Sequence, residues 1–222
     1  MNTAISATIY FWHFYPKMIK WKIKERDCIE NDALLQATIN VSIIVDLTTY
    51  LEALINKILS SILKQKINTD EKFQNQLYSY LQEKLNDATW SNYSEYFELI
   101  CNLKLTEKLD SNLVKTINTL FIFRNIIVHG NDIKIDYFYN KNNILDYSSS
   151  KKKSKTIIQF LKEKKLINLN LTKLTDIFDI VNNHVITHFY DNTMKYIESI
   201  FELLPNKEIE EIKKIYESNI EY

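Results

Sequence analysis

Hydrophobic residues recur along most of this chain at the three- and four-residue spacing of an α-helix. The clearest example runs from about residue 30 to residue 66. One face of this segment carries large aliphatic side chains at Leu47, Leu51, Leu54, Ile55 and Ile58. Residues at these spacings lie on one side of a helix, so the pattern predicts a long helix that buries this face in a core. Similar patterns predict further helices at residues 72–86, 92–101, 111–129, 156–164 and 172–204, and a charged terminal helix from residue 206.

Residue types that start and stop helices mark several of these boundaries. Asn92 followed by Glu95 is typical of a capping box at a helix N-terminus, and Ser111 is expected to cap the next helix. That helix is expected to end at Gly130, because glycine readily takes the left-handed conformation that follows many helices. Pro205 is expected to end the long helix that precedes it.

The first part of the chain, residues 1–26, is an arm rich in aromatic and basic side chains. Charged and apolar residues alternate between Lys20 and Lys24, so this arm fits a short strand or an irregular segment as well as a helix. We interpret its aromatic residues as core or dimer-interface residues rather than as stacking platforms for bases. The arm is expected to belong to one domain that covers residues 1–222.

A second segment, residues 130–155, also departs from the helical pattern. It contains an alternating stretch at 132–147 that predicts a small hairpin. A polar, basic loop is expected to follow at 148–155. We interpret the whole segment as an insertion in an otherwise helical protein.

The scarcity of turn residues supports an all-α fold. The 222 residues include one glycine and two prolines. Sheet-rich folds need glycine, proline and Asn-Gly pairs in their tight turns, whereas helices can be joined by short polar loops. The sequence therefore predicts an antiparallel helical bundle with a loop or small hairpin inserted in it.

Composition and charge restrict the class of protein. Hydrophobic residues make up 45% of the chain and charged residues 25%, which is typical of a soluble globular protein. Lys+Arg and Asp+Glu number 28 each, so the net charge is zero and any RNA contact would have to come from local patches. Cys28 and Cys101 lack metal-binding spacing, no segment approaches about 18 uninterrupted apolar residues, and the N-terminus does not read as a signal peptide. We therefore expect a cytoplasmic protein without a membrane span.

Candidate chemistry concentrates at the end of the helix predicted at 111–129. Arg124 falls within an apolar stripe formed by Leu113, Ile117, Leu120 and Val128. Burying a guanidinium alone is costly, so Arg124 must find a partner or line a cleft. Asn125 and His129 are four residues apart and therefore neighbours on an adjacent face of the helix. Arg26 and Arg124 are the two arginines of a lysine-rich chain, which indicates positions that need a guanidinium specifically.

These three residues suit cleavage of a phosphodiester without a metal. The imidazole of His129 can serve as a general acid or base and take or return a proton at a ribose 2′-hydroxyl or at the 5′-leaving oxygen. The guanidinium of Arg124 can hold the phosphate in a fork and offset the charge that develops on its oxygens. The amide of Asn125 can orient either partner. No metal-ligand set and no cofactor are expected.

Arg124 and Asn125, followed after three residues by His129 and Gly130, resemble the R-x4-6-H motif of HEPN domains in its RNxxVHG form. The order of predicted helices is similar as well, since an earlier helix reads DLTTYLEALINKIL and two helices follow the motif. The resemblance extends over roughly residues 30–204, although its specific part is about ten residues long. It implies a helical bundle of HEPN type that usually dimerises, so that two motif helices form one composite RNA cleft.

The resemblance also implies an activity. Many HEPN proteins are toxins or antiviral ribonucleases that leave a 2′,3′-cyclic phosphate and a 5′-hydroxyl. Arg124, Asn125 and His129 match their catalytic residues, and Glu52 resembles an acidic residue that faces the motif in some members. Asn131 occupies the place of a tyrosine that is AMPylated in HEPN toxins silenced by a partner nucleotidyltransferase, so this form of silencing is not expected.

The function expected is that of a metal-independent endoribonuclease that acts on RNA as a homodimer, as a toxin or in antiviral defence. Its further partner would be an antitoxin or a protein of a defence system. The alternatives are a catalytically inactive HEPN module that binds RNA, nucleotide or a partner protein, and a purely structural helical dimer. In the structural alternative Arg124 forms an ion pair with Glu52 and His129 only caps its helix.

Two other groups of residues are weaker candidates. Lys151, Lys152 and Lys153 belong to a basic run that is either a solvated face or an RNA contact. His184 and His188 are four residues apart and could share a metal, but no third ligand is evident. We interpret these histidines as helix-surface or interface residues.

Overall fold

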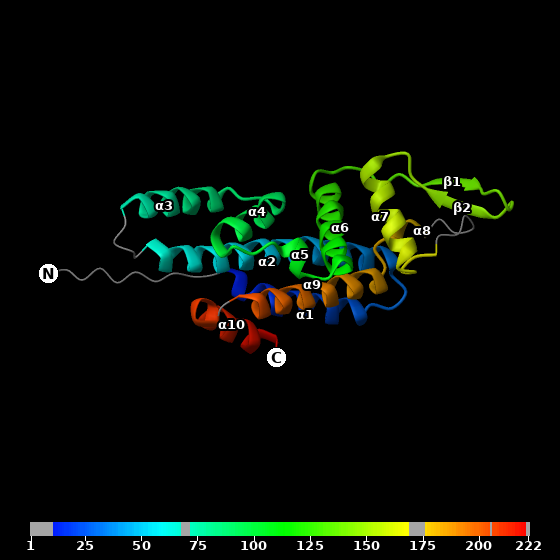
Figure 1. The fold of residues 1–222 in the computed structure, drawn as a ribbon. Coiled ribbons are helices and arrows are strands. Elements are labelled where there is room, and N and C mark those ends of the chain that lie inside the picture. Colours follow the sequence, from blue (N-terminus) through cyan, green and yellow to red (C-terminus); the bar gives the residue numbers. More distant parts are fainter. Residues whose placement is uncertain (1–10, 68–71, 169–175, 205, 221–222) are drawn as a thin grey trace.

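The computed structural model describes residues 11–67, 72–168, 176–204 and 206–220, and it confirms the predicted all-α bundle with a small hairpin insertion (Figure 1). In chain order the elements are η1 (Phe11–His13), α1 (Tyr15–Asp27), α2 (Ala33–Ile67), α3 (Lys72–Asn86), α4 (Trp90–Cys101), α5 (Leu105–Lys108), α6 (Ser111–Val128), β1 (Asp136–Tyr139), β2 (Leu145–Ser148), α7 (Lys152–Glu163), α8 (Asp176–Asp179), α9 (Asn183–Leu203) and α10 (Asn206–Ile220).

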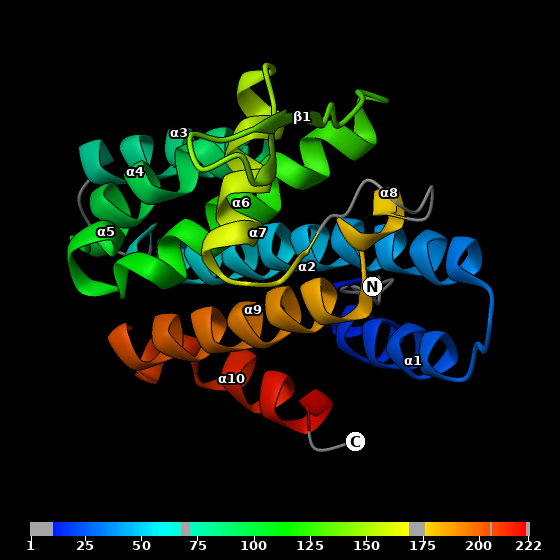
Figure 2. The same cartoon turned by 90° about the vertical axis from the view of Figure 1, so that its right-hand side faces the viewer.

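Helix α2 lies at the centre of the bundle. It has 35 residues and is therefore about 50 Å long at a rise of about 1.5 Å per residue. Helices α1, α9 and α10 lie on one side of it, and α3, α4 and α6 lie on the other (Figures 1 and 2). The predicted core stripe of α2 is confirmed, because all five of its members are at most 1% exposed: Leu47, Leu51, Leu54, Ile55 and Ile58.

The same helix is the part of the described chain that resembles a membrane span. Ala33–Lys66 is long and apolar enough by length and composition to cross a membrane, with a hydropathy of 1.4 in its most apolar window. Half of that window is buried inside the bundle. The central helix of a bundle can be as apolar as a membrane span, because the helices packed around it bury its side chains.

The N-terminal arm is helical where the structure describes it. Tyr15–Asp27 forms α1, which packs along α2, so the helix is the correct alternative for this part of the arm. Pro16 lies in the first turn, where its missing N–H is tolerated. Residues 1–10 lie outside the described part.

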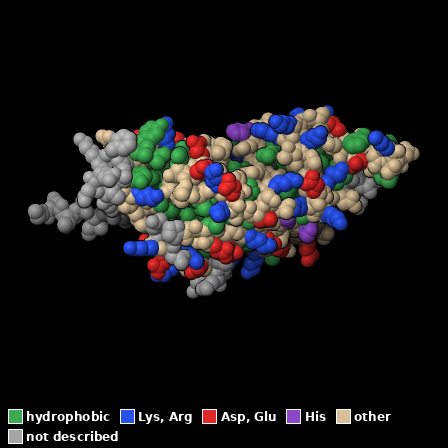
Figure 3. Space-filling model, in the orientation of Figure 1, with side chains coloured by type: hydrophobic (Ala, Val, Ile, Leu, Met, Phe, Trp, Pro, Cys, Tyr) green, Lys and Arg blue, Asp and Glu red, His purple; other side chains and the backbone are tan. Residues whose placement is uncertain are grey.

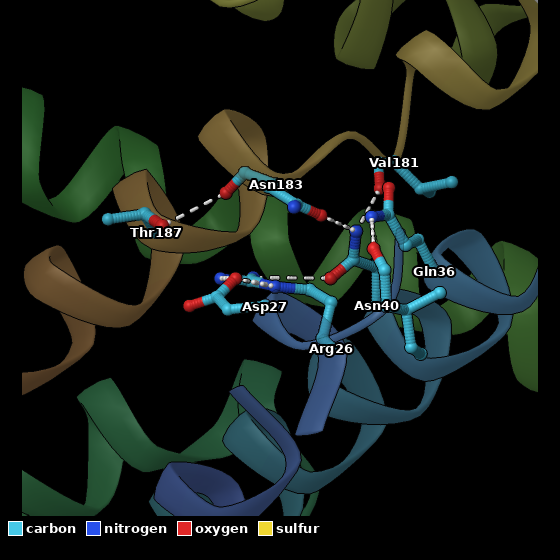
Figure 4. Close-up of polar contacts among 8 residues, drawn as sticks. Arg26, Asp27, Gln36, Asn40, Val181, Asn183 and Thr187 are labelled. Atoms are coloured by element: carbon cyan, nitrogen blue, oxygen red, sulfur yellow. Dashed lines mark hydrogen bonds and ion pairs between the residues drawn. The ribbon is translucent and has the colours of Figure 1, made fainter. Parts of the chain in front are cut away.

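Arg26 joins three helices in the interior (Figure 4). Its side chain is 3% exposed and donates from Nε and Nη2 to Asp27 Oδ1, at 2.9 and 2.7 Å, and from Nη1 to Asn40 Oδ1 at 3.3 Å. Asn40 Nδ2 in turn donates to the Val181 carbonyl (2.7 Å) and to Asn183 Oδ1 (2.9 Å) at the start of α9. One of the two arginines of the chain is therefore structural, and it needs several donors in a fixed plane.

Two predicted helix starts are wrong. Helix α4 begins at Trp90, and Thr89 is its N-cap, with the Thr89 N–H donating to Asn92 Oδ1 at 3.1 Å. Asn92 is therefore the third residue of the helix rather than its cap. Asp110, not Ser111, caps α6, because its carboxylate accepts from the Leu113 N–H at 2.9 Å and carries the charge that a helix N-terminus favours.

The later helices also differ from the prediction. Helix α7 begins at Lys152, so the second half of the loop expected at 148–155 is helical. The single helix expected at 172–204 is interrupted, because Asn182 accepts from the Val185 N–H at 2.8 Å and starts α9 as a separate helix. Residues 169–175 and Pro205 lie outside the described part of the chain.

The predicted hairpin is confirmed. Strand β1 pairs antiparallel with β2, with Tyr137 opposite Tyr147. The side chain of Asn140 closes the turn between them by accepting from the N–H groups of Asn142 (2.9 Å) and Ile144 (3.1 Å). The hairpin projects from the end of the bundle that holds α7 (Figure 1).

Candidate functional site

The end of α6 is shaped by the glycine that follows it. His129 is the C-cap, and Gly130 takes a left-handed φ of 60°. The Gly130 N–H donates to the Ile127 carbonyl (3.1 Å) and the Asn131 N–H to the Ile126 carbonyl (2.9 Å), which is the hydrogen-bond pattern of a Schellman motif. A Cβ atom at Gly130 would meet nothing within 4 Å, so backbone conformation rather than space favours glycine here.

Arg124 lies where the core stripe of α6 reaches the surface. Its predecessors in the predicted stripe, Leu113, Ile117 and Leu120, are buried as expected. Val128 was expected to continue the stripe, but it is 48% exposed, so the buried stripe does not reach the last residue of α6. Arg124 itself is partly exposed.

The guanidinium of Arg124 makes only some of the hydrogen bonds that its donors allow. Nη1 donates to Asn125 Oδ1 at 3.0 Å. The Nε atom is buried and has no hydrogen-bond partner among the described residues. Asn125 therefore holds one side of the guanidinium fork and leaves donors on the other side for a ligand.

A cavity of about 760 Å³ brings the four predicted site residues together. Arg124, Asn125 and His129 come to it from α6, and Glu52 comes from α2. The start of α4 and the loop before it complete the wall with Ala88, Thr89, Trp90 and Ser91, and α6 adds Asn118, Phe121 and Ile122. His129 is exposed at the rim.

Glu52 lines this cavity without forming an ion pair to Arg124. Of the ion pairs within 4.0 Å between described residues, none joins these two side chains. Burial raises the pKa of the Glu52 carboxyl above its ordinary value, although the charge of Arg124 and the Trp90 N–H lower it in part. The structural Arg124–Glu52 pair that the sequence allowed is therefore not formed.

Trp90 is a wall residue that the sequence did not indicate. Its ring stacks on Phe121 with centroids 4.0 Å apart and planes 10° apart, and its Nε1 donates to Asn118 Oδ1 at 2.9 Å. Asn118 could have been found, because it lies seven residues before Asn125 on the same face of α6. Trp90 comes from another helix, and nothing in its own segment points to the cavity.

The basic run Lys151, Lys152 and Lys153 lies elsewhere. All three side chains are exposed at the start of α7, and none lines the cavity. Lys and Arg side chains are interspersed with Asp and Glu over the described part of the face seen in Figure 3. On this face any attraction for RNA therefore depends on particular side chains rather than on a broad basic surface.

The histidines of α9 are set apart from this site. His184 is exposed, whereas His188 lies beside Phe160, with ring centroids 6.0 Å apart. Burial, followed by the charge of Lys164, lowers the pKa of His188. Within the described residues, no group of three or more His, Cys, Asp or Glu side chains could hold a metal ion.

Comparisons with models of protein families, with curated proteins and with solved structures give no match for this chain. What the chain does must therefore be argued from the chemistry of its own residues. Those that share the cavity are a guanidinium, an amide, an imidazole and a carboxyl with a raised pKa.

Proposed function

We propose that this protein is a metal-independent endoribonuclease that uses Arg124, Asn125 and His129. The observation that carries the proposal is the state of Arg124, whose guanidinium lines an open cavity beside His129 with one buried N–H lacking a partner. A buried donor without a partner costs stability, and an anionic ligand would remove that cost. A phosphate diester supplies such an anion.

Arg124 would bind the phosphate that is cleaved. Its Nη1 is held by Asn125, which fixes the plane of the guanidinium and leaves the Nε side for two phosphate oxygens. Negative charge grows on those oxygens as the fifth bond to phosphorus forms. Donors already in place stabilise this charge without reorganisation.

His129 would move the proton. In the cleavage step the ribose 2′-oxygen attacks phosphorus, and the bond from phosphorus to the 5′-oxygen breaks. The 2′-hydroxyl loses its proton to a base and the leaving 5′-oxygen gains one from an acid, so a 2′,3′-cyclic phosphate and a 5′-hydroxyl result. An exposed imidazole at the cavity rim can serve either role, since it reaches both solvent and ligand.

A second copy of the chain would supply the other proton-transfer group. One cavity contains one histidine, whereas the reaction needs both a base and an acid. Val128 and His129 are both exposed at the end of α6, so a symmetric partner can pack there and bring a second His129. An enzyme of this kind would act as a toxin or an antiviral effector, as its resemblance to HEPN proteins implies.

The test uses purified protein and a labelled single-stranded RNA. Wild-type protein should cut the RNA, and both Arg124→Ala and His129→Ala should abolish cutting while keeping the helical circular dichroism spectrum. Expression of the wild type, but not of either variant, should arrest growth. Equal cutting by the wild type and His129→Ala would refute the proposal.

A further inference from the structure

A polar stripe runs along α2 beside its buried stripe. Its members are spaced three or four residues apart and lie on one side of the helix: Thr49, Glu52, Asn56, Ser60 and Lys64. All five are at least partly exposed. The apolar core does not include this stripe, although Asn56 and Ser60 form hydrogen bonds to α3.

A second cavity, of about 600 Å³, follows this stripe between η1, α2 and α3. We call it the α2 groove, and its lining includes Trp12, Asn56, Lys57, Ser60, Lys64 and Gln82. It shares Glu52 and Ala88 with the cavity that contains Arg124 and His129. The two cavities therefore adjoin at Glu52 and Ala88, and together, from His129 to Lys64, they are called the path below.

Hydrogen bonds fix the polar groups of the α2 groove. Gln82 Nε2 donates to Ser60 Oγ at 2.9 Å, and Ser60 Oγ donates to Asn56 Oδ1 at 3.2 Å. Asn56 Nδ2 donates to the Leu85 carbonyl at 2.6 Å. Because each donor in this chain has its acceptor, the amide of Gln82 is oriented with Oε1 away from Ser60.

The path contains three buried polar atoms without a hydrogen-bond partner in the described structure. They are Trp12 Nε1, Gln82 Oε1 and Arg124 Nε. Trp12 itself is 4% exposed. Buried polar atoms are usually paired in folded proteins, so a ligand that binds in the path and contacts these three atoms would supply partners that the fold itself does not. Such a ligand must both accept, for Trp12 and Arg124, and donate, for Gln82.

Two lysines place positive charge along the same path. Lys57 and Lys64 line the α2 groove, and Lys64 is exposed. Twelve residues of helix separate Glu52 from Lys64, which is about 18 Å at a rise of about 1.5 Å per residue. A nucleic-acid strand with a stacked rise of about 3.4 Å would place about five nucleotides over this length, and an extended strand would place fewer.

We propose that the α2 groove is a binding site for the single-stranded RNA that flanks the cleaved phosphodiester, with Lys57 and Lys64 at its phosphates and Gln82 at a ribose hydroxyl or a base. The proposal rests on the proposed ribonuclease function, because the groove leads into the cavity of Arg124. A polyanion without donors, such as an acidic peptide bound through its carboxylates, would leave Gln82 Oε1 unpaired. A base-paired duplex would hide the base edges that Gln82 is proposed to contact.

The experiment measures binding of fluorescent single-stranded RNAs of four and twelve nucleotides by anisotropy. The protein is the full chain with His129→Ala, which is intended to stop cleavage. Lys64→Glu is compared with Lys24→Glu, because Lys24 is also exposed but lies on α1, on the opposite side of α2 from α3. Both variants change the net charge equally. The twelve-nucleotide RNA should bind more tightly than the four-nucleotide RNA, as expected for a site of several nucleotides.

Lys64→Glu should weaken binding of the twelve-nucleotide RNA by about tenfold or more. It should also reduce the slope of log affinity against log salt concentration by the amount expected for about one phosphate contact. Lys24→Glu should have less than about a twofold effect. Equal effects of the two substitutions, or equal affinity for a paired duplex or for polyglutamate, would overturn the groove assignment even if wild-type protein cuts RNA. If RNA binding depends on Lys64 but His129→Ala cuts RNA as fast as the wild type, the groove assignment stands and the proposed ribonuclease mechanism is wrong.

Discussion

Arg124 and Glu52 line the same cavity but do not form an ion pair, although opposite charges in a partly buried site would ordinarily be expected to pair. The guanidinium instead bonds to Asn125, and the Glu52 carboxyl accepts from the Trp90 N–H. The cavity therefore keeps a cation available for an anion from outside. The charge of Arg124 is therefore not used up in an ion pair with the carboxyl that shares its cavity.

The two arginines allow a matched comparison. Arg124→Lys keeps the charge but loses the planar fork, so the RNA cleavage rate should fall by about 10²–10³ while the thermal midpoint stays near that of the wild type. Arg26→Lys removes donors from the buried cluster with Asp27 and Asn40, so it should lower the free energy of unfolding by about 2 kcal/mol. Its cleavage rate per folded molecule should be unchanged. The reverse result, a destabilised but active Arg124→Lys, would make Arg124 structural.

Glu52 should make stability depend on pH. Its pKa is raised in the folded state above the ordinary 4.5, so the folded protein binds more protons than the unfolded chain between that value and the raised one. The stability that protonated Glu52 contributes is present below pH 4.5 and is lost as pH rises through the raised pKa. Glu52→Gln imitates the protonated form, so its thermal midpoint should exceed that of the wild type at neutral pH and match it near pH 4. Equal midpoints at every pH would contradict this.

Cleavage should not need a metal. The proposed reaction is carried by the guanidinium and imidazole of the cavity, so treatment with EDTA should leave the rate unchanged. The products should carry 2′,3′-cyclic phosphate and 5′-hydroxyl ends, which mass spectrometry distinguishes from 5′-phosphate ends. A 5′-phosphate product, or activity that EDTA removes and added Mg²⁺ restores, would exclude this mechanism.

Activity should depend on a dimer formed at the end of α6. Val128→Asp places a charge on an exposed apolar side chain beside His129, so sedimentation should show monomers and the cleavage rate should fall at least about tenfold. Leu35→Asp is the control, because Leu35 has a similar exposure, 45% against 48%, but lies near the start of α2 and does not line the cavity that contains His129. A wild-type protein that cuts RNA as a monomer would rule out the shared cleft.

Helical spacing was enough to predict the bundle because each long helix buries a regular stripe. It failed at boundaries where two neighbouring residues could both cap, as with Asp110 and Ser111, and where one asparagine interrupts an apolar pattern, as with Asn182. In these places a single side-chain hydrogen bond decides the outcome. The spacing of apolar residues along the sequence gives no information about that hydrogen bond.

The candidate site was only partly predictable for a different reason. Arg124, Asn125 and His129 are close in sequence, so a local motif is sufficient to find them. Trp90 and the α2 groove depend on how α3 and α4 pack against α2, which no local pattern specifies. The role of Arg26 likewise depends on Val181 and Asn183, more than 140 residues from their partner Asn40.

The central position of α2 has a consequence for how the protein loses activity. Its N-terminal half joins the Arg26 cluster, and its C-terminal half forms the floor of both cavities. Backbone amides in the middle of α2 should therefore be among the last to exchange with deuterated solvent, with opening free energies close to that of global unfolding. Thermal inactivation and loss of helical signal should then coincide in one cooperative transition, because the floor of the cavities cannot melt while the rest of the bundle stays intact.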